Sequence, residues 1–567
     1  MESARSKGMW LLVMVLALAL IVGTLLVGCG QSPETTPTEP EETEEPEEEA
    51  EEEAEEVDEG PQRGGTVNLA LFQPPNTFIE YFSLGNQAIA PARMIYSSLM
   101  IRDINGEFAP DLATDFEISD DGMEYVFNLN PDARFHDGEP VTANDVAFTF
   151  KLLMSPEWGG SRTADVMAIS GAQAYRDGEV DAVDGIEVLD DHRIKFTLGE
   201  TYVPFVDRIY LLSILPEHLL GDVDIASMDE SEFAMRAPVG SGPFKFKEYR
   251  TGEYLELVKN TDFYKGEPYL DSIIIKILTE EVAVAQLETG ELDGNMVWSA
   301  AGISPQYVPR LEGLSNVELD IFAAQRFSKV VFNHDEDPMS DPRFRKALSY
   351  AADREGIAEA IDRGFGQPAK SPVPPGTPFF CDDAEQHVYD PDRAREILEE
   401  IGYDGETFTL LTTDAAARAQ LAELLQQWWG DVGVEVEILA FDFPTQLGRV
   451  TDGEYQIAIM GWATGAIDPD YTLTHTLHSR NAAPAGWNFS RYKSDEMDEL
   501  LDRARYEMDE ATRMDLYCRV QQLVSADTPQ IYLTFSQAVS ARSTRWHNGE
   551  DSMFGRLSNS YEWWLEQ

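Results

Sequence analysis

The chain opens with a long uncharged segment and becomes strongly polar after it. Residues 8–27 hold no charged residue and follow Arg5 and Lys7. A basic start, an apolar centre and a small residue at the end are typical of a secretory signal over residues 1–28. The run is almost long enough to span a bilayer, so an uncleaved membrane anchor is the main alternative. Both interpretations place the remaining chain outside the cytoplasm.

The next segment has a composition that cannot form a core. Residues 31–60 contain 16 acidic residues, no basic residue and no aromatic residue. Such a segment cannot bury enough apolar surface to fold, and its like charges extend it. We therefore expect residues 29–63 to be a disordered tether with a maximum reach of about 110 Å.

From residue 64 onward, apolar positions follow strand and helix periods in turn. Alternation predicts strands over 64–71, 125–129, 434–438 and 454–460. Helical spacing predicts helices over 93–100, 142–150, 341–351 and 421–429. Thr142 and Asp341 are the predicted N-caps of two of these helices, and Gly430 is the predicted end of the last. Strands that alternate with helices predict mixed α/β lobes.

The folded part is too long for one hydrophobic core. The chain has 567 residues, of which 43% are hydrophobic and 10% aromatic. Single cores stop growing beyond about 250–300 residues, so we expect at least two lobes. Three cysteines occur, Cys29, Cys381 and Cys518. An oxidising compartment would permit a bridge between Cys381 and Cys518, although the sequence alone does not decide whether it forms.

Acidic residues dominate the charge. Asp and Glu total 103 against 42 Lys and Arg, which gives a formal net charge of −61, and only 12 of the basic residues are Lys. Binding to nucleic-acid phosphates requires Lys and Arg, so this class of function is excluded. The protein repels itself in dilute salt, whereas at 1 M salt the Debye length falls to about 3 Å. We therefore hypothesise a high-salt habitat.

The sequence contains no motif of nucleophilic, metal-dependent or nucleotide-dependent catalysis. The patterns GxSxG, HExxH, GxxxxGK(S/T) and GxGxxG are absent. Carboxylate pairs are too common in this chain to indicate acid–base catalysis. His475 and His478 have an i,i+3 spacing that could hold a metal, but exposed or capping imidazoles on a helix are the simpler interpretation. We predict that the protein is not an enzyme and that it needs no cofactor.

The end of the apolar segment resembles the lipobox of prokaryotic lipoproteins. It reads Leu-Val-Gly-Cys over residues 26–29. The resemblance implies cleavage before Cys29 and lipid on its sulfur and on the new amino terminus. The acidic tether would then hold a folded body near the outer face of the cytoplasmic membrane.

Residues 134–150, RFHDGEPVTANDVAFTF, resemble the signature of the family 5 extracellular solute-binding proteins, the peptide- and nickel-binding class that serves ABC importers. Further blocks follow in the order of that family, at 239–244, 257–266, 269–273, 290–293, 341–348, 352–354 and 371–376. The resemblance covers about residues 64–550. It implies an α/β clamshell of the periplasmic-binding-protein type, with two lobes, a third inserted subdomain and two hinge crossings.

The resemblance also implies a division of the chain. Lobe I would comprise 64–107, 236–332 and 533–567, the inserted subdomain 108–235, and lobe II 333–532. The hinge would use Phe332 and Asn333 on one crossing, and Leu533 and Phe535 on the other. Only a few residues need to absorb the backbone change when such lobes close.

The implied function is that of a monomeric lipoprotein that captures di- or oligopeptides and delivers them to an ABC permease driven by its ATPase. A non-peptide ligand, either an oligosaccharide or a nickel or other metal chelate, is the first alternative. An exported hydrolase and a sensory lipoprotein are more remote alternatives. Closure of two lobes on the ligand requires contacts to both of them.

The residues after the predicted strand 454–460 are the sharpest candidates for ligand binding. They are Trp462, Ala463, Gly465 and Asp468. In peptide-binding members of the family an Asp shortly after the Trp pairs with the ligand's α-amino group, and Gly465 occupies that position here. An unpaired buried ammonium costs several kcal/mol. Either Asp468 or another acid substitutes, or the ligand is not a peptide with a free amino group.

The remaining candidates for ligand contact are polar or aromatic residues on other loops. They are Asn76, Tyr81, Phe82 and Asn86 after the first strand, and Trp487 and Asn488 after residue 462. Ligand sites combine apolar walls with a few polar groups, which these residues could supply. A purely structural role remains the alternative for each of them, and for Trp462 the alternative is a core aromatic.

Overall fold

The computed structural model describes residues 60–83, 86–296, 302–464, 467–552 and 557–567. These residues belong to one compact unit, Glu59–Gln567. The predicted signal, Cys29 and most of the tether lie outside the described residues, and so does Gly465. Among the residues that are described, no helix is both long and apolar enough to cross a membrane.

One large mixed sheet dominates the part of the chain that the structure describes. Its strands are β1 (Thr66–Leu71), β8 (Phe244–Arg250), β9 (Tyr254–Lys259), β10 (Ser272–Ile277), β11 (Gly294–Asn295), β12 (Val317–Phe332), β13 (Gly366–Pro368), β14 (Thr407–Thr413), β15 (Glu435–Phe441), β16 (Ile457–Ala463) and β17 (Gln530–Ser543). Their order is β15-β14-β16-β12-β17-β11-β1-β10-β9-β8, and β13 pairs with β17.

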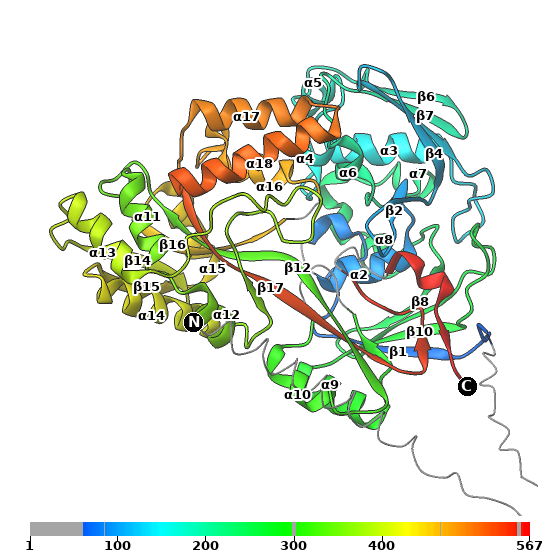
Figure 1. Ribbon diagram of the computed structural model, residues 1–567. Coiled ribbons are helices and arrows are strands. Elements are labelled where there is room, and N and C mark those ends of the chain that lie inside the picture. The colour runs from blue at the N-terminus through cyan, green and yellow to red at the C-terminus, as the bar shows by residue number, and fades with distance from the viewer. Residues whose placement is uncertain (1–59, 84–85, 297–301, 465–466, 553–556) are drawn as a thin grey trace, which may run out of the picture. The chain divides into compact units, whose positions relative to one another are not determined.

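Two long strands connect the halves of this sheet. Strands β12 and β17 are antiparallel and pair from Val317 with Ser543 to Val331 with Gln530. They lie side by side across the middle of the molecule in Figure 1. The pairing register shifts between Ala323 and Lys329. The irregularity therefore lies between the regular stretches at the two ends of the strand pair.

A separate sheet lies within residues 113–197. It consists of β4 (Ala113–Ile118), β5 (Glu124–Leu129), β6 (Ile186–Asp190) and β7 (Arg193–Thr197), in the order β4-β5-β7-β6. Helix α3 (Ala143–Met154) contacts β6 and β7, and its residue Phe150 stacks on Phe196 of β7. The sequence predicts Thr142 as the N-cap of this helix, and in the structure Thr142 and Asp145 form a capping box there.

The hydrophobic cores fall into two groups along the chain. One group includes Val67 and Phe150 in one cluster and Val317 in another. The second group contains Val330 with Trp429 in one cluster, and Tyr517 in another. Because β12 contributes to both groups, two bodies of packed side chains share its backbone.

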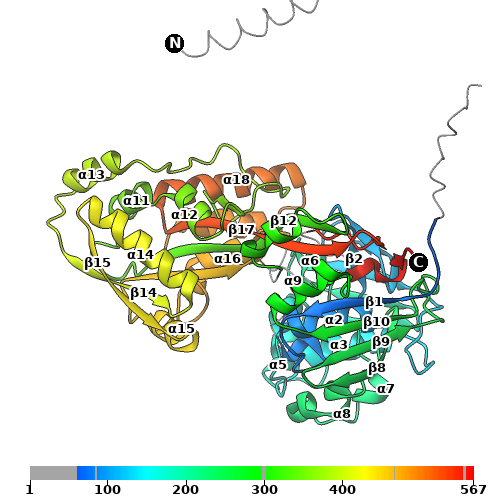
Figure 2. The same cartoon turned by 90° about the horizontal axis from the view of Figure 1, so that it is seen from below.

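Helices cover the second group of cores. They are α11 (Pro342–Tyr350), α12 (Arg354–Ala360), α13 (Pro391–Glu400), α14 (Ala416–Asp431), α15 (Phe443–Asp452), α16 (Asp470–Leu477), α17 (Asp495–Tyr506) and α18 (Glu510–Asp527). Figure 2 shows most of them, α11 to α16 and α18, around the end of the sheet that contains β14 and β15. Asp341 caps α11 by accepting a hydrogen bond from the Arg343 amide, as predicted.

Three predicted boundaries are wrong. The first helix is α2 (Asn86–Ile95) and not 93–100, because the chain turns at Ser98, whose amide donates to Asp111, and Met100 begins β2 (Met100–Arg102). Helix α14 starts before residue 421 and continues through Gly430. Strand β16 begins at Ile457 and continues through Trp462, so this residue lies on a strand and not on the loop after it.

The cysteine pair that the sequence left open forms a disulfide. Cys381 and Cys518 are bonded, with their Cα atoms 4.9 Å apart. The bond joins the segment after β13 to helix α18. It therefore links two parts of the second group of cores that are 137 residues apart in the sequence.

Candidate functional site

The carboxyl end of β16 has an open edge. Strand β12 pairs with β16 along its full length, from Ile457 to Ala463. On the other side, β14 pairs only with Ile457 and Ala458. Gly461 and Ala463 are exposed, and among the described strands none covers their outer edge. A strand edge with free backbone groups is a template for another extended chain.

Trp462 faces the opposite side of the sheet from Gly461 and Ala463, and it is largely buried. Its indole nitrogen donates a hydrogen bond to Thr472 Oγ1 at 3.2 Å. Its ring lies 5.9 Å from those of Tyr471 and Trp487, and the Trp487 contact is edge-on. Trp487 is 47% exposed. The two tryptophans thus form an aromatic corner in which Trp487 presents most of the accessible surface.

Asp468 is already paired within the protein. Its carboxylate accepts two hydrogen bonds from the Arg513 guanidinium, at 2.5 and 2.8 Å. Its amide donates to the carboxylate of Asp207 at 3.1 Å. Asp468 is also buried. The pair with Arg513 therefore gives Asp468 a structural role. Its carboxylate is not free to replace the ligand-binding Asp that is absent at position 465.

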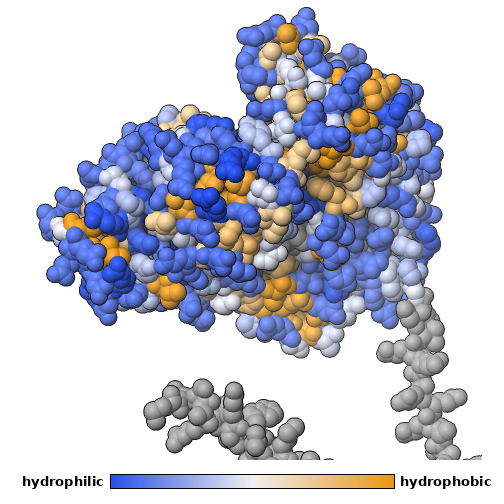
Figure 3. All heavy atoms as spheres, turned by 45° about the horizontal axis from the view of Figure 1, so that its top comes forward, coloured by the Kyte–Doolittle hydropathy of each residue, from blue (hydrophilic) through white to orange (hydrophobic). Residues whose placement is uncertain are grey.

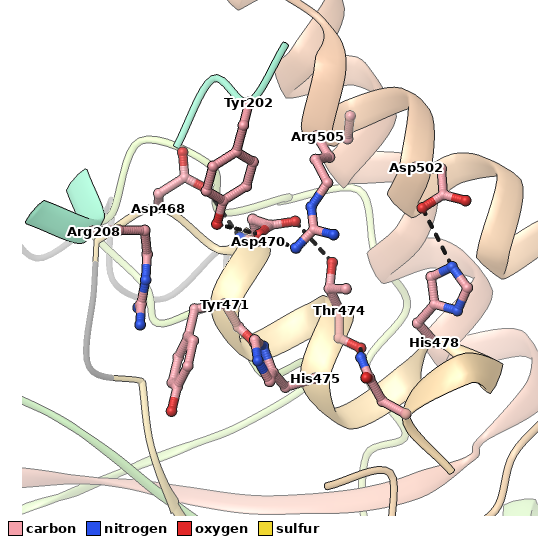
Figure 4. Close-up of polar contacts among 12 residues, drawn as sticks. Tyr202, Arg208, Asp468, Asp470, Tyr471, Thr474, His475, His478, Asp502 and Arg505 are labelled. Atoms are coloured by element: carbon pink, nitrogen blue, oxygen red, sulfur yellow. Dashed lines mark hydrogen bonds and ion pairs between the residues drawn. The ribbon is translucent and has the colours of Figure 1, made fainter. Parts of the chain in front are cut away.

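A network of polar contacts joins the start of α16 to the segment around residue 202. The buried Asp470 accepts hydrogen bonds from Tyr202 Oη at 3.1 Å, from Arg505 Nη2 at 3.1 Å and from Thr474 Oγ1 at 2.8 Å. Figure 4 shows these side chains converging on Asp470. The Arg208 guanidinium lies over the Tyr471 ring at 4.1 Å. Residues from the two groups of cores meet here.

The two histidines considered as metal ligands have different protein partners. His475 Nδ1 contacts the Tyr471 carbonyl at 2.7 Å, and burial lowers the pKa of His475. His478 lies 3.2 Å from Asp498 and 3.3 Å from Asp502. Figure 4 shows His478 directed towards Asp502 and away from His475. Among the described residues, no group of three or more His, Cys, Asp or Glu could hold a metal ion.

The candidate ligand-contact residues near the first strand differ in how deeply they are buried. Asn76 is exposed, whereas Tyr81 is buried and donates a hydrogen bond to the Ser213 carbonyl at 2.7 Å. Phe82 packs against Trp158, with 4.6 Å between ring centroids. Asn86 begins α2, and its side chain is not described. Tyr81 and Phe82 thus contribute to the first group of cores.

Asn488 is a structural residue of the loop that presents Trp487. It is fully buried, and its amide nitrogen donates to the carbonyls of Leu477, His478 and Tyr492. Its side-chain oxygen accepts from the Tyr492 amide. These bonds fix the loop beside Trp462, so Asn488 positions Trp487.

Three cations close to this site were not among the predicted residues. Lys329 and Arg326 lie on β12, opposite Met460 and Ala463. Arg418 of α14 donates to Ser328 Oγ at 3.1 Å, and a Cβ on Gly461 would lie 2.7 Å from its Nη2. Burial lowers the pKa of Arg418 to about 10, and the neighbouring Arg326 adds to the shift. Lys329 is the single charged residue in the apolar segment just before Asn333, and this pattern was the one sequence signal that could have identified it.

Comparison with known proteins places this geometry in a family. The family described as "Bacterial extracellular solute-binding proteins, family 5 Middle" matches residues 107–484. The chain belongs to this family. The predicted family and fold class are therefore confirmed, and the family consists of extracellular solute-binding proteins.

Relatives within family 5 cover almost the whole chain. The oligopeptide-binding protein AppA of Bacillus subtilis strain 168 is 26% identical over 529 residues, which is 89% of this chain and 92% of AppA. The heme-binding protein A of Haemophilus influenzae is 27% identical over 500 residues, 83% of this chain and 87% of that protein. The structure of B. subtilis AppA with a nonapeptide superposes with a TM-score of 0.72 at 26% identity, and covers 90% of this chain and 100% of AppA.

Proposed function

We propose that this protein captures peptides outside the cytoplasm and delivers them to the permease of an ABC importer. The open edge of β16 at Gly461–Ala463 is the observation on which the proposal depends. An extended peptide can add to such an edge through main-chain hydrogen bonds, while nearby pockets select its side chains. Small exposed residues at 461 and 463 leave the edge accessible. Peptide binding by AppA, a relative over most of the chain, supports the same ligand class.

The direct test changes the ligand and leaves the protein intact. Peptides of two to nine residues are screened by thermal shift at high salt, each beside a copy that is N-methylated at alternate amides. A ligand at about 100 times its dissociation constant stabilises the folded state by about 2.7 kcal/mol. We expect one N-methylation pattern to abolish the shift and the complementary pattern to preserve it. A shift that survives both patterns would exclude pairing with the β16 edge.

Heme, oligosaccharide and nickel or other metal chelates are the competing ligands. The relationship to heme-binding protein A favours keeping a planar chelate in the screen, and the half-exposed Trp487 beside Trp462 could stack on one. A shift of several degrees with a sugar or chelate, and none with any peptide, would replace the peptide proposal.

The absence of an acidic residue at position 465 leads to a separate prediction. If this position faces the ligand's amino terminus, Gly465→Asp should improve binding of peptides with a free α-amino group and leave their N-acetylated copies unchanged. The gain should be about tenfold, the value of one charge-assisted hydrogen bond. Isothermal titration of both peptide forms to both proteins measures it. Equal affinity of the two proteins for free-amino peptides would contradict the assignment of Gly465.

The proposal also includes a division of the chain into lobes and a hinge between them. We assign lobe I to 64–107, 236–332 and 533–567, the inserted subdomain to 108–235 and lobe II to 333–532. Phe332 and Leu533 pack within the second group of cores, and Asn333 donates to the Gly453 and Tyr455 carbonyls of the same body. The register shifts between Ala323 and Lys329, opposite Phe535, favour a hinge nearer to that stretch.

The proposed protein works as a monomer held to the membrane by lipid on Cys29. A tether over residues 29–63 would keep the ligand-binding body close to its permease. Globomycin-sensitive processing, or a Cys29→Ser variant released into the medium, tests this anchor. A Cys29→Ser protein that stays with the membrane would favour an uncleaved anchor instead.

A further inference from the structure

Lys329 is a basic side chain that is buried inside the protein without a hydrogen-bond or ion-pair partner in the described part of the chain. Its side chain is 0% exposed, and its Nζ makes no hydrogen bond. Among the described residues, no carboxylate oxygen lies within 4.0 Å of it. Burial lowers its pKa to about 7, and no neighbouring charge opposes that shift. Charged groups that are buried in proteins are normally paired, so this cation requires an explanation.

The surroundings of Lys329 connect it to the site. Its Nζ lies 5.3 Å from the centroid of the Trp462 ring. On the other neighbouring strand it pairs with Tyr532, whose hydroxyl is also buried and has no hydrogen-bond partner. The side-chain oxygen of Gln530, two residues before Tyr532 in β17, is also buried without a hydrogen-bond partner. Unpartnered polar atoms thus gather on the face of β12 and β17 that bears Trp462.

The opposite face of the same strand ends is also cationic. Arg326 pairs with Ala463 in the strand register, and Arg418 reaches Ser328 beside Gly461. Within the described residues, neither arginine forms an ion pair at or below 4.0 Å. The chain as a whole has a net charge of −61 and only 12 Lys. In this acidic chain, three cations without a described carboxylate within 4.0 Å thus lie close to the carboxyl end of β16: Lys329 and Arg326 on the neighbouring strand β12, and Arg418 on α14.

We propose that Lys329 is the anchor for a carboxylate of the ligand, and that the protein selects acidic ligands. This inference rests on the proposed function and specifies its substrate class: peptides, or compounds with a peptide-like backbone, that bring a carboxylate to Trp462. A carboxylate accepts charge-assisted hydrogen bonds from the ammonium and can also accept one from Tyr532 Oη. The ligand thereby supplies the charge that the protein lacks at this place. The absence of an acid at position 465 agrees with this polarity, because the site does not demand a cationic ligand.

The test compares wild-type protein with Lys329→Met, and uses Lys370→Met as the matched control. Lys370 also lies over an aromatic ring, 4.7 Å from the Phe380 centroid, but it is only half-buried and donates to the Asp382 carbonyl. Isothermal titration at high salt uses Ala-Glu-Ala-Ala and Ala-Gln-Ala-Ala, together with the isomers that place Glu or Gln at each other position. We expect the best acidic peptide to bind wild-type protein about tenfold or more tightly than its Gln copy. Lys329→Met should lose this ratio, and Lys370→Met should keep it.

A second arm separates this inference from the peptide proposal. Thermal shifts with succinate, citrate and chloride at equal ionic strength measure carboxylate binding without a peptide backbone. If no peptide binds but carboxylates stabilise wild-type protein more than Lys329→Met, the inference stands and the peptide proposal falls. If peptides bind equally with Glu and Gln, or if Lys329→Met keeps the acidic preference, peptide capture stands and the inference is overturned. If neither the peptides nor the small carboxylates bind, both the inference and the peptide proposal are overturned.

Folding of the variant is controlled independently. Methionine replaces a buried ammonium by an apolar group of similar length, and such replacements are often neutral or stabilising. The melting temperature of Lys329→Met should equal or exceed that of wild-type protein without ligand. Lys329→Gln serves as the second variant, and it should likewise lose the preference for acidic peptides. A Gln variant that folds and keeps this preference would contradict the role of the ammonium.

Discussion

A single imidazole joins two segments far apart in the sequence. His136 Nε2 lies 3.0 Å from the Gly242 carbonyl, and its Nδ1 accepts a hydrogen bond from the Gly240 amide at 3.3 Å. Both bonds require the neutral ring with the proton on Nε2. Burial lowers the pKa of His136 to about 4, although the Gly242 carbonyl opposes the shift. The residue therefore resists protonation in the folded state.

This pKa predicts an acid-dependent loss of stability. Because the folded-state pKa lies below the ordinary value of 6.5, His136 contributes stability above pH 6.5 that is lost as the pH falls towards 4. The contribution should be about 3 kcal/mol. Chemical denaturation of wild-type protein and His136→Gln across this pH range measures it. The difference between the two proteins should shrink with falling pH, and a constant difference would contradict the prediction.

At the scale of elements, the disulfide between Cys381 and Cys518 holds a loop against helix α18. Buried Gln521 of the same helix accepts from the Cys381 amide and from Ser371 Oγ. The bond closes 137 residues of chain. Cross-links that close long loops restrict the unfolded chain most strongly in the chain-entropy description. The bond should therefore stabilise the second group of cores.

Removal of this disulfide should lower the unfolding free energy by about 4–5 kcal/mol on the chain-entropy scale. The measurement is the melting temperature of wild-type protein, Cys518→Ser and Cys29→Ser, each with and without a reductant. Reductant should lower the transition of wild-type protein and of Cys29→Ser, and leave Cys518→Ser unchanged. An unchanged wild-type transition after complete reduction would show that the bond contributes no stability.

At the scale of the whole molecule, the charge is the dominant property. Hydrophilic residues cover most of the face shown in Figure 3. The net charge of −61 exceeds what the acidic segment at 31–60 contributes, so the folded part also repels itself. Many cations of the folded part are already paired, as Arg513 is with Asp468 and Arg545 with Asp293. These pairs leave the excess of carboxylates unbalanced.

The expected consequence is a strong dependence of stability on salt. The melting temperature should rise from about 0.1 M to 1 M NaCl, as the Debye length falls from about 10 Å to about 3 Å. A truncated protein that begins at residue 60 should show most of the same rise, because the charge lies chiefly on the folded part. Differential scanning calorimetry of both proteins checks this. A flat or falling curve would exclude the high-salt hypothesis.

Local patterns sufficed for much of the fold because they depend on neighbours in the sequence. The N-caps at Asp341 and Thr142 and strand β5 follow from spacing alone, and each is present. The errors occurred where long-range contacts override local preference. The Asp111 carboxylate takes the Ser98 amide and ends the first helical segment early. Gly430 stays inside α14 because packing of Trp429 in the second group of cores continues the helix.

The candidate site was predictable only in part for the same reason. Trp462 and Ala463 could be found because they follow a strongly apolar strand, and the structure places both at the open end of β16. Tyr81 and Asn488 are also polar or aromatic loop residues, yet their hydrogen bonds serve the fold. No local pattern distinguishes these two situations. The distinction depends on which partners the folded chain brings within hydrogen-bonding distance.

The sequence by itself determined the class of the protein, through the order of its motifs, the uncharged segment 8–27, the acidic segment 31–60 and the excess of carboxylates. These properties depend on composition and on short spacings. Only the tertiary structure decided which charges are satisfied. It pairs Asp468 with Arg513, 45 residues away in the chain, and leaves Lys329 beside Trp462 without a carboxylate. The physical reason is that pairing and burial are set by distances across strands and helices, and these distances exist only after folding.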